Sequence, residues 1–328
     1  METISKLSEL EANALAEMDL NAGISFSSLG RKLNTSKVTA SNLIERLVSR
    51  KVILGYSAVI DLSKIGYTAY GVFIKLKNIT EKDYDKLITK ISSHSSVHGI
   101  AECGGPYDLM FTINAEQIYT LHEVLSSLQQ GYARFFQDCK ISTRVTVNYY
   151  SREYLKRKMK LPREYSFSRT LRKSKSQLPL DDLDKKILNI LAGNARIPIT
   201  EIANKLKVAR STITNRITAL ESNKVIIGYL SRIQSPSYGY QVFQLRITLQ
   251  NKSPQIVEQI FKWATTEPCI VHVVNVIANW DFEVTCEVPH QDELQKIIRR
   301  LNSYGTDIIS DLEVALVFKL FYKYAFTI

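Results

Sequence analysis

Apolar residues near the start of the chain recur at the spacing of amphipathic helices. A first helix is indicated by five positions that follow the three-and-four spacing of one helix face: Leu7, Leu10, Ala14, Leu15 and Met18. Phe26–Leu33 predicts a short second helix. In a third, Ala40, Ile44 and Leu47 place apolar groups at i, i+4 and i+7. Three short helices with a tight turn before the last predict a helix-turn-helix.

The pattern then changes to that of strands. Val52–Ile60 is β-branched and broken by glycine, which predicts an extended ribbon, a wing, after the helix-turn-helix. From Tyr67 the order becomes strand, helix, strand, strand, helix, strand. The expected ranges are Tyr67–Lys77, Lys82–Ser93, Val97–Cys103, Tyr107–Asn114, Glu116–Gln130 and Asp138–Tyr150. This order predicts a ferredoxin-like βαββαβ domain.

The same series of patterns returns later in the chain. Gly55-Tyr56 recurs as Gly228-Tyr229, at an offset of 173 residues. The second series comprises helices from Leu180 to Leu191, Ile199 to Leu206 and Ile213 to Leu220, the ribbon Val225–Ile233, and then Tyr240–Gln250, Pro254–Thr265, Ile270–Ile277, Asp281–Val288, Gln291–Ser303 and Ile308–Tyr322. A period of domain size indicates a tandem duplication and not an array of small repeats.

The predicted fold class is therefore α+β, with two copies of a winged helix-turn-helix domain followed by a ferredoxin-like domain. The expected boundaries are 1–60 and 61–155 for the first copy, 156–175 for a linker, and 176–233 and 234–328 for the second copy.

Charge is concentrated in the expected linker. The whole chain has a net charge of +11, and eight basic residues but only one acid lie between Lys156 and Lys173. Clustered Lys and Arg beside a DNA-binding module would add phosphate contacts. A solvated spacer is the alternative interpretation.

The sequence does not favour a membrane-spanning or secreted protein. The apolar stretch from Val314 to Phe326 is interrupted by Lys319 and Lys323 and is shorter than the roughly 20 residues of a membrane span. The first residues lack the pattern of a signal peptide, so we expect a cytoplasmic protein without a membrane partner.

Metal and redox sites are also disfavoured. The four cysteines, Cys103, Cys139, Cys269 and Cys286, form no CxxC pair, so we expect reduced, packed thiols. His94 and His98 are spaced i, i+4, but Glu267 and Val271 replace them in the second copy. We therefore predict no metal and no bound cofactor.

The third helix of each copy has a polar face opposite its apolar stripe. In the first copy this face comprises Ser36, Lys37, Thr39, Asn42 and Arg46. In the second it comprises Arg210, Ser211, Thr212, Asn215 and Arg216. Arg can contact guanine and Asn adenine, and Ser, Thr and Lys reach phosphates, so these residues are the predicted contacts to double-stranded DNA.

Several of these segments resemble a known family. They are Leu183–Leu191, Ile202-Ala203, Arg210–Ile217, Leu220–Tyr229 and the turn Gly105-Pro-Tyr-Asp108. Each copy resembles a full-length member of the leucine-responsive regulator/AsnC family, whose members join a winged helix-turn-helix to a βαββαβ ligand-sensing domain. The resemblance implies a sequence-specific transcription regulator that has no enzymatic activity and no catalytic residues.

The resemblance also implies an effector site and self-association. Family members bind small effectors, often amino acids, near the turn between the second and third strands. The implied effector residues are Gly104, Gly105, Tyr107, Asp108, Asn279, Trp280 and Asp281. Family sensing domains pair, so a fused tandem is expected to form that pair within one chain as a pseudo-dimer, and to form homo-oligomers.

The two copies differ at informative positions. Leu43 stands where the second copy has Arg216, and Ala278 stands where the first has Gly105. We therefore expect unequal DNA-binding units and an asymmetric operator.

Two alternatives remain. Siroheme decarboxylases resemble the same layout and use histidine and arginine around a tetrapyrrole. His98 and His272, each after a valine, are the best candidates for such histidines. However, they differ by one position in the repeat alignment, and no arginine follows closely. The other alternative is a ligand-binding or assembly protein that has lost DNA binding.

Overall fold

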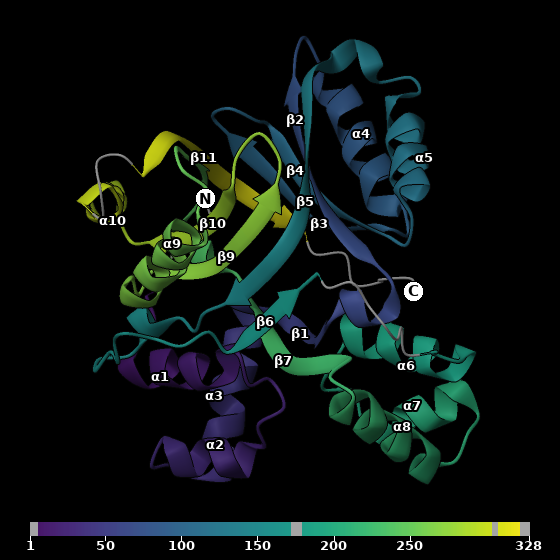
Figure 1. Cartoon of the computed structure of the whole chain (residues 1–328). Coiled ribbons are helices and arrows are strands. Elements are labelled where there is room, and N and C mark those ends of the chain that lie inside the picture. Colours follow the sequence, from purple (N-terminus) through teal and green to yellow (C-terminus); the bar gives the residue numbers. More distant parts are fainter. Residues whose placement is uncertain (1–5, 172–178, 304–307, 322–328) are drawn as a thin grey trace.

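Two three-helix units are present in the structure, a computed structural model that describes residues 6–171, 179–303 and 308–321 (Figure 1). The first three-helix unit contains α1 (Glu9–Asp19), α2 (Phe26–Lys32) and α3 (Lys37–Ser49), followed by β1 (Ile53–Ile60). The second contains α6 (Asp182–Gly193), α7 (Ile199–Leu206) and α8 (Arg210–Ser222), followed by β7 (Ile226–Ile233). The expected helices are confirmed, with ends that differ by a few residues.

Polar residues cap several of these helices. Ser8 and Glu11 form a capping box at α1, in which each side chain binds the other residue's backbone N–H. Ser36 accepts a hydrogen bond from the backbone N–H of Thr39 at the start of α3. One of the predicted DNA contacts, Ser36, therefore also begins its helix.

Each half of the chain next forms a four-stranded sheet covered by two helices. The first sheet has the order β5-β2-β4-β3, and the second has the order β11-β8-β10-β9, which is the predicted ferredoxin-like arrangement. The first half contains β2 (Thr68–Leu76), α4 (Glu81–Ser93), β3 (Val97–Gly104), β4 (Leu109–Ala115), α5 (Ile118–Gln129) and β5 (Phe136–Tyr149). The second contains β8 (Gln241–Leu249), α9 (Pro254–Thr266), β9 (Ile270–Ile277), β10 (Phe282–Val288), α10 (Gln291–Ser303) and β11 (Ile309–Phe321).

The two sheets are joined by their long last strands. One part of β5 pairs with β2, and the following part pairs with β9 of the other half. In the same way, β11 pairs with both β8 and β3. The eight strands therefore form a closed ring of main-chain hydrogen bonds, with no free strand edge where the halves meet.

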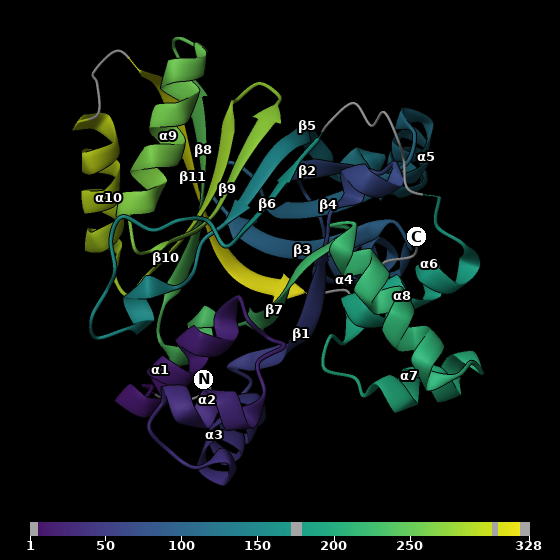
Figure 2. The ribbon, with the colours of Figure 1, turned by 60° about the horizontal axis from the view of Figure 1, so that its bottom comes forward.

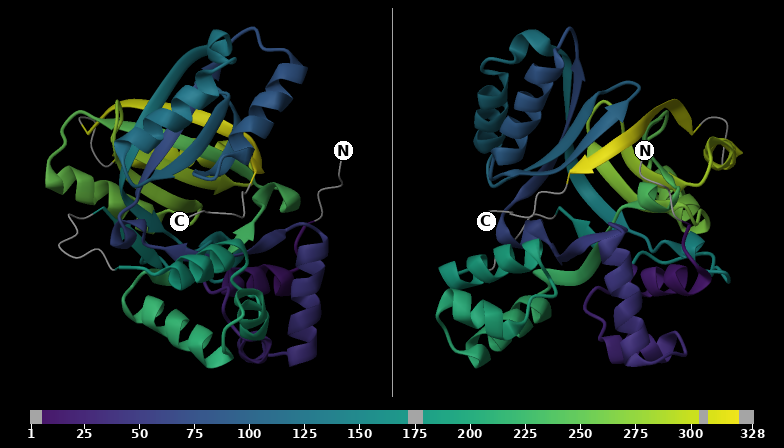
Figure 3. Two further views of the ribbon diagram at one scale, coloured as in Figure 1. Left: turned by 90° about the vertical axis from the view of Figure 1, so that its right-hand side faces the viewer. Right: turned by 180° about the vertical axis from the view of Figure 1, so that it is seen from behind.

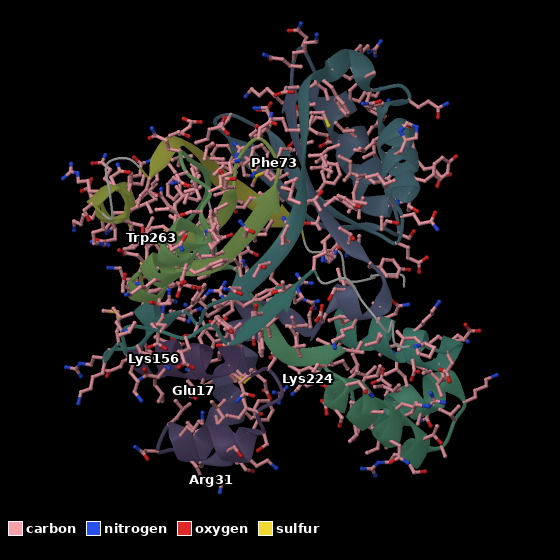
Figure 4. All side chains as sticks on the ribbon, in the orientation of Figure 1. Glu17, Arg31, Phe73, Lys156, Lys224 and Trp263 are labelled. Atoms are coloured by element: carbon pink, nitrogen blue, oxygen red, sulfur yellow. The ribbon has the colours of Figure 1, made fainter. Side chains whose placement is uncertain are left out.

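Separate apolar clusters hold the layers together. The helices α4 and α5 pack on the first sheet, and α9 and α10 pack on the second, where Trp263 is fully buried (Figures 3 and 4). A further cluster between the sheets includes Phe73, Tyr107 and Trp280. Each half thus has its own core, and a shared core lies between them.

The prediction of a wing after each helix-turn-helix is wrong. β1 pairs antiparallel with β7, with Ser57 opposite Leu230, so the two strands form one ribbon between the halves. Figure 1 shows this ribbon between the three-helix units and the sheets. A strand can satisfy its backbone groups with any neighbour, and here that neighbour belongs to the other half of the chain.

Each three-helix unit packs against strands of the other half. Ile233 and Tyr238 complete the core of the first unit, while Ala58 and Ile60 complete that of the second. Both units lie at the same end of the molecule, side by side (Figures 1 and 2).

Only part of the expected linker packs against the protein: residues 157–162 and 164–166 are exposed, whereas Arg163 is buried and residues 167–170 are partly buried. Phe167–Thr170 forms β6, which pairs with β5. The Arg163 guanidinium donates to the backbone oxygens of Ala264, Glu267 and Ile270 around the end of α9. Lys156 lies beside Glu17 (Figure 4). Arg172 and Lys173 lie outside the described residues.

Across the described ranges, no helix combines the length and apolar character needed to cross a membrane.

Candidate functional site

The polar face of α8 is largely open to solvent. Arg210, Ser211 and Asn215 are exposed, and Thr212 is partly exposed. Ile213 and Leu220 on the opposite side are buried in the unit's core. The helix therefore presents its hydrogen-bonding side chains outward, as contact with a DNA groove requires. Their role in DNA binding stays a prediction.

The polar face of α3 is exposed as well. Ser36, Lys37, Thr39, Asn42 and Arg46 all lie on the surface. Val38 is also exposed there, with 66% of its surface accessible. Leu43, which occupies the position of Arg216, is instead buried in the first unit. The two helices thus offer different surfaces.

Arg216 has partners within its own unit. Its guanidinium lies 2.8 Å from Asp181 and 3.2 Å from Asp184, at the start of α6. Asp181 also accepts a hydrogen bond from the backbone N–H of Asp184 and so caps α6. This geometry favours a role in joining α8 to α6 over direct reading of a base.

The two turns implied as effector sites enclose a buried cation. The Arg246 guanidinium carbon lies 3.7 Å from the ring centre of Tyr107 and 4.9 Å from that of Trp280, and its Nη2 is 3.3 Å from a Glu313 oxygen. The Arg246 side chain has no exposed surface. Tyr107 and Trp280 therefore form cation–π contacts where the sheets meet.

The turn aspartates fasten neighbouring strands. Asp108 accepts a hydrogen bond from the backbone N–H of Leu76, and Asp281 accepts the equivalent bond from Leu249. Lys75 and Lys252 pair with them at 3.0 and 2.7 Å. These contacts give the carboxylates of Asp108 and Asp281 a structural role.

The other turn residues lie close to the opposite sheet or at the surface. Gly105 has a φ of +114°, and a Cβ there would lie 2.9 Å from the Val314 carbonyl oxygen. A side chain would meet the edge of β11, which explains the glycine. Gly104 is partly exposed and faces Phe318, and Asn279 is exposed.

A cavity of about 320 Å³ lies elsewhere, between the β1/β7 ribbon and the two sheets. Its lining includes His98 and His272 and four arginines, Arg144, Arg152, Arg169 and Arg232. None of the seven turn residues belongs to that lining. The turn motif did not indicate this cavity.

Only a weak sign of this cavity is present in the sequence. The arginines come from β5, the segments after it, and β7, so their spacing in the chain carries no pattern. Arg144 and Arg232 do interrupt strands rich in β-branched residues, where an unpaired buried charge is costly. Although no arginine closely follows either histidine in the sequence, the fold therefore brings four arginines into the same cavity as His98 and His272.

A buried ion network adjoins the cavity, whose lining includes Asp19 and Arg152. Arg152 donates to both oxygens of Glu287 at 2.8 Å and to Asp19 at 2.5 Å. Tyr154 also donates to Glu287. At the positions 173 residues away in the other half of the chain, Ala192 corresponds to Asp19 and Asn114 to Glu287. The cavity is therefore electrostatically asymmetric.

Burial and charge govern the protonation of this network. Burial raises the pKa of Asp19, against the opposing effect of Arg152. For Glu287, burial acts in the same direction, but the charge and hydrogen bonds of Arg152 outweigh it and lower the pKa. Arg152 thus holds at least Glu287 ionised.

His272 is held neutral. Burial and the charge of Arg152, with smaller contributions from Arg144 and Arg169, lower its pKa from 6.5 to about 3 despite Glu287. Its ring packs edge-on against Tyr149, with ring centres 4.8 Å apart. Near neutral pH, the imidazole can donate or accept a hydrogen bond but adds no positive charge.

The four cysteines are free thiols, and three of them are buried. Burial raises the pKa of Cys103 and Cys269 to about 12. They are suited to packing and not to thiolate chemistry.

Comparison with known proteins identifies the family of this chain. A model of the AsnC-type helix-turn-helix domain matches residues 180–221. An uncharacterized HTH-type transcriptional regulator of Pyrococcus furiosus is 31% identical over 140 residues, which cover 42% of this chain and 93% of the relative. The chain belongs to the Lrp/AsnC family of transcriptional regulators. Another relative in this family, the HTH-type regulator LrpA of Pyrococcus horikoshii, is 43% identical over 63 residues, or 19% of this chain and 45% of the relative.

The overall architecture of this Lrp/AsnC family member also occurs in a solved structure. Siroheme decarboxylase NirDL, in complex with an iron-uroporphyrin III analogue, aligns with a TM-score of 0.61 over 98% of this chain and 94% of its own. The sequences are 13% identical, so the likeness concerns the fold alone.

Proposed function

We propose that this chain is a sequence-specific DNA-binding transcription regulator built as a fused pseudo-dimer. The observation that carries this function is the exposed polar face of α8, within the segment that matches the family's helix-turn-helix. A regulator must present such a face outward to reach base edges. Because related proteins are transcriptional regulators, we expect this chain to bind DNA as well.

The repeated order of elements supports the pseudo-dimer. Both halves contain the same order of elements, and strand pairing between β5 and β9 and between β11 and β3 joins them. We propose the domain boundaries given above, with β1 and β7 as a shared ribbon. Because α3 and α8 differ, each unit would contact its own half-site.

Selection of bound fragments from a random DNA pool tests this function. The expected result is salt-sensitive binding to sites with two unlike halves. Arg210→Ala should weaken specific binding by about 1–3 kcal/mol if Arg210 reads a base. Lys205→Ala, an exposed change on α7, is the matched control. Absence of binding to any DNA would refute the regulator, and selection of perfect palindromes would refute unequal half-sites.

For the seven turn residues we propose a structural role. Burial of Tyr107 and Trp280 around Arg246, and the backbone bonds of the aspartates, support it. If an amino-acid effector bound at the turns, Asn279→Ala should weaken its binding, measured by calorimetry, because Asn279 is an exposed turn residue.

A second candidate function is a decarboxylase acting on a tetrapyrrole. The specific observation in its favour is that His98 and His272 line one cavity together with four arginines. A cavity of about 320 Å³ lies near the lower end of the roughly 300–1,000 Å³ typical for small-molecule sites, which disfavours a macrocycle. Incubation with siroheme tests it: product formation that is lost in His272→Ala would support the enzyme, and an unchanged siroheme would not.

A further inference from the structure

The cavity between the ribbon and the sheets has the size of a site for a small organic molecule. Its volume of about 320 Å³ exceeds that of a few ordered waters. Both copies contribute walls: Ser57 and Ile60 come from β1, Arg232 from β7, and Gln244 from β8. A molecule bound there would contact the ribbon and both sheets at once.

Arg169 brings uncompensated positive charge to this cavity. Its Nη1 donates to the Ile60 carbonyl oxygen at 3.2 Å, and its Nη2 donates to the Tyr149 hydroxyl at 2.7 Å. Both acceptors are neutral. The Nε atom is buried and has no hydrogen-bond acceptor among the described residues. A partly buried guanidinium whose hydrogen-bond acceptors are all neutral favours an anionic partner.

Arg144 is only weakly compensated. Its single carboxylate contact is to Glu283 at 3.4 Å, and its Nε is also buried without an acceptor among the residues described. Glu283 itself already accepts hydrogen bonds from Ser142 and Trp280. The two arginines therefore retain donor capacity toward the cavity.

The acids of the lining are already engaged, which disfavours a cationic ligand. Asp19 receives two hydrogen bonds from Arg152, from its backbone N–H at 2.8 Å and its guanidinium at 2.5 Å. Glu283 has the partners given above. His272 is neutral, so the excess positive charge comes from the arginines.

The remaining walls are suited to an apolar body with one further polar group. Val147, Val274 and Leu62 are buried apolar residues of the lining. Asn114 lines the same cavity, and its Oδ1 is buried without a donor in the described chain. A hydroxyl on the ligand could supply that donor.

We propose that this cavity binds a small organic carboxylate with an apolar, planar or branched body, and that Arg169 and Arg144 bind its carboxylate. Guanidinium groups recognise carboxylates through paired, charge-assisted hydrogen bonds. The site is distinct from the turns implied as effector sites.

A consequence for regulation follows, and this part rests on the proposed function. Arg169 connects Ile60 of the ribbon with Tyr149 of the first sheet. A carboxylate that draws its guanidinium away from either acceptor would change how the ribbon, and with it the three-helix units, attaches to the sheets. Ligand binding would then alter DNA affinity, and DNA would alter ligand affinity by the same factor.

Calorimetry on the full chain tests the site with benzoate, 4-hydroxybenzoate and phenylacetate as probes and benzamide as the neutral counterpart. We expect saturable binding of at least one carboxylate, with 4-hydroxybenzoate tighter than benzoate, and no saturable binding of benzamide. Arg169→Gln should reduce carboxylate affinity by about tenfold or more, because it removes a charge-assisted pair. Arg157→Gln, at an exposed arginine of the same segment paired with Glu9, should leave it unchanged.

A second variant tests the site independently if Arg169→Gln does not fold. Ala192 lines the cavity at the end of α6 and is only partly buried, so Ala192→Leu fills space without removing a charge. It should also weaken binding while the melting temperature stays at or above that of the wild type. Failure of all three carboxylates to bind at up to about 10 mM, equal binding of benzamide, or wild-type affinity in both variants would overturn the proposal.

DNA-binding titrations with and without the carboxylate separate the two proposals. Arg169-dependent carboxylate binding by a chain that binds no DNA would leave the site standing and refute the regulator. DNA binding without carboxylate binding would refute the site alone. If both ligands bind without affecting each other, the site stands and the regulatory consequence is wrong.

Discussion

Arg152 is a residue whose side chain joins distant parts of the molecule. It binds Asp19 at the end of α1 and Glu287 in β10, and all three are buried. Arg152→Gln would leave two buried carboxylates without their counter-charge. We expect it to lower the free energy of unfolding by about 3–5 kcal/mol, measured by chemical denaturation.

Arg157→Gln is the control for that measurement. Its ion pair with Glu9 lies at the surface, where 79% of the Arg157 side chain is accessible, so its loss should change stability little. Equal effects of the two substitutions would show that the buried network does not stabilise the fold as we argue.

His272 makes stability depend on pH in a defined window. Its pKa is about 3 in the folded chain and 6.5 ordinarily, so the unfolded chain binds more protons between these values. Stability should therefore fall as the pH decreases below 6.5, by up to about 1.4 kcal/mol per pH unit from this residue. Denaturation midpoints between pH 7 and about pH 4.5 measure the slope.

His272→Phe should flatten that slope, because phenylalanine keeps the aromatic packing on Tyr149 and cannot bind a proton. His290→Gln, an exposed change, is the matched control. A slope that is the same in His272→Phe and in the wild type would contradict the argument.

Among the elements, α8 depends on α6 for its position. Arg216 connects them through Asp181 and Asp184, whereas Arg210 on the same helix faces solvent. Arg216→Ala should lower the melting temperature by on the order of a few degrees, and Arg210→Ala should leave it unchanged. Thermal denaturation followed by circular dichroism checks both. A larger loss in Arg210→Ala would reverse the assigned roles.

Helices and strands were predicted well because their signals are local. The spacing of Ile213, Ile217 and Leu220 depends only on which side of one helix is buried. The wing was predicted wrongly because a strand's partner is not encoded in its own residues. β1 has the composition of a strand, but its pairing with β7 depends on where the second half of the chain lies.

For the whole molecule, the closed ring of strands predicts that neither half is complete. In separate halves, β5 would lose β9, β11 would lose β3, and β1 would lose β7. Expressed together as 1–175 and 176–328, the halves should elute as a one-to-one complex in size-exclusion chromatography. Each expressed alone should aggregate or self-associate through its exposed edges. Two stable, separate monomers would contradict this.

The sequence by itself determined the repeated order of elements, the polar faces of α3 and α8, and the family, because periodicity and short motifs are local properties of the chain. Only the tertiary structure decided that β1 pairs with β7, that Arg216 binds α6, and that His98, His272 and four arginines meet in one cavity. These contacts join residues that lie far apart in the chain. Their proximity arises from strand pairing between the halves, which no spacing in the sequence specifies.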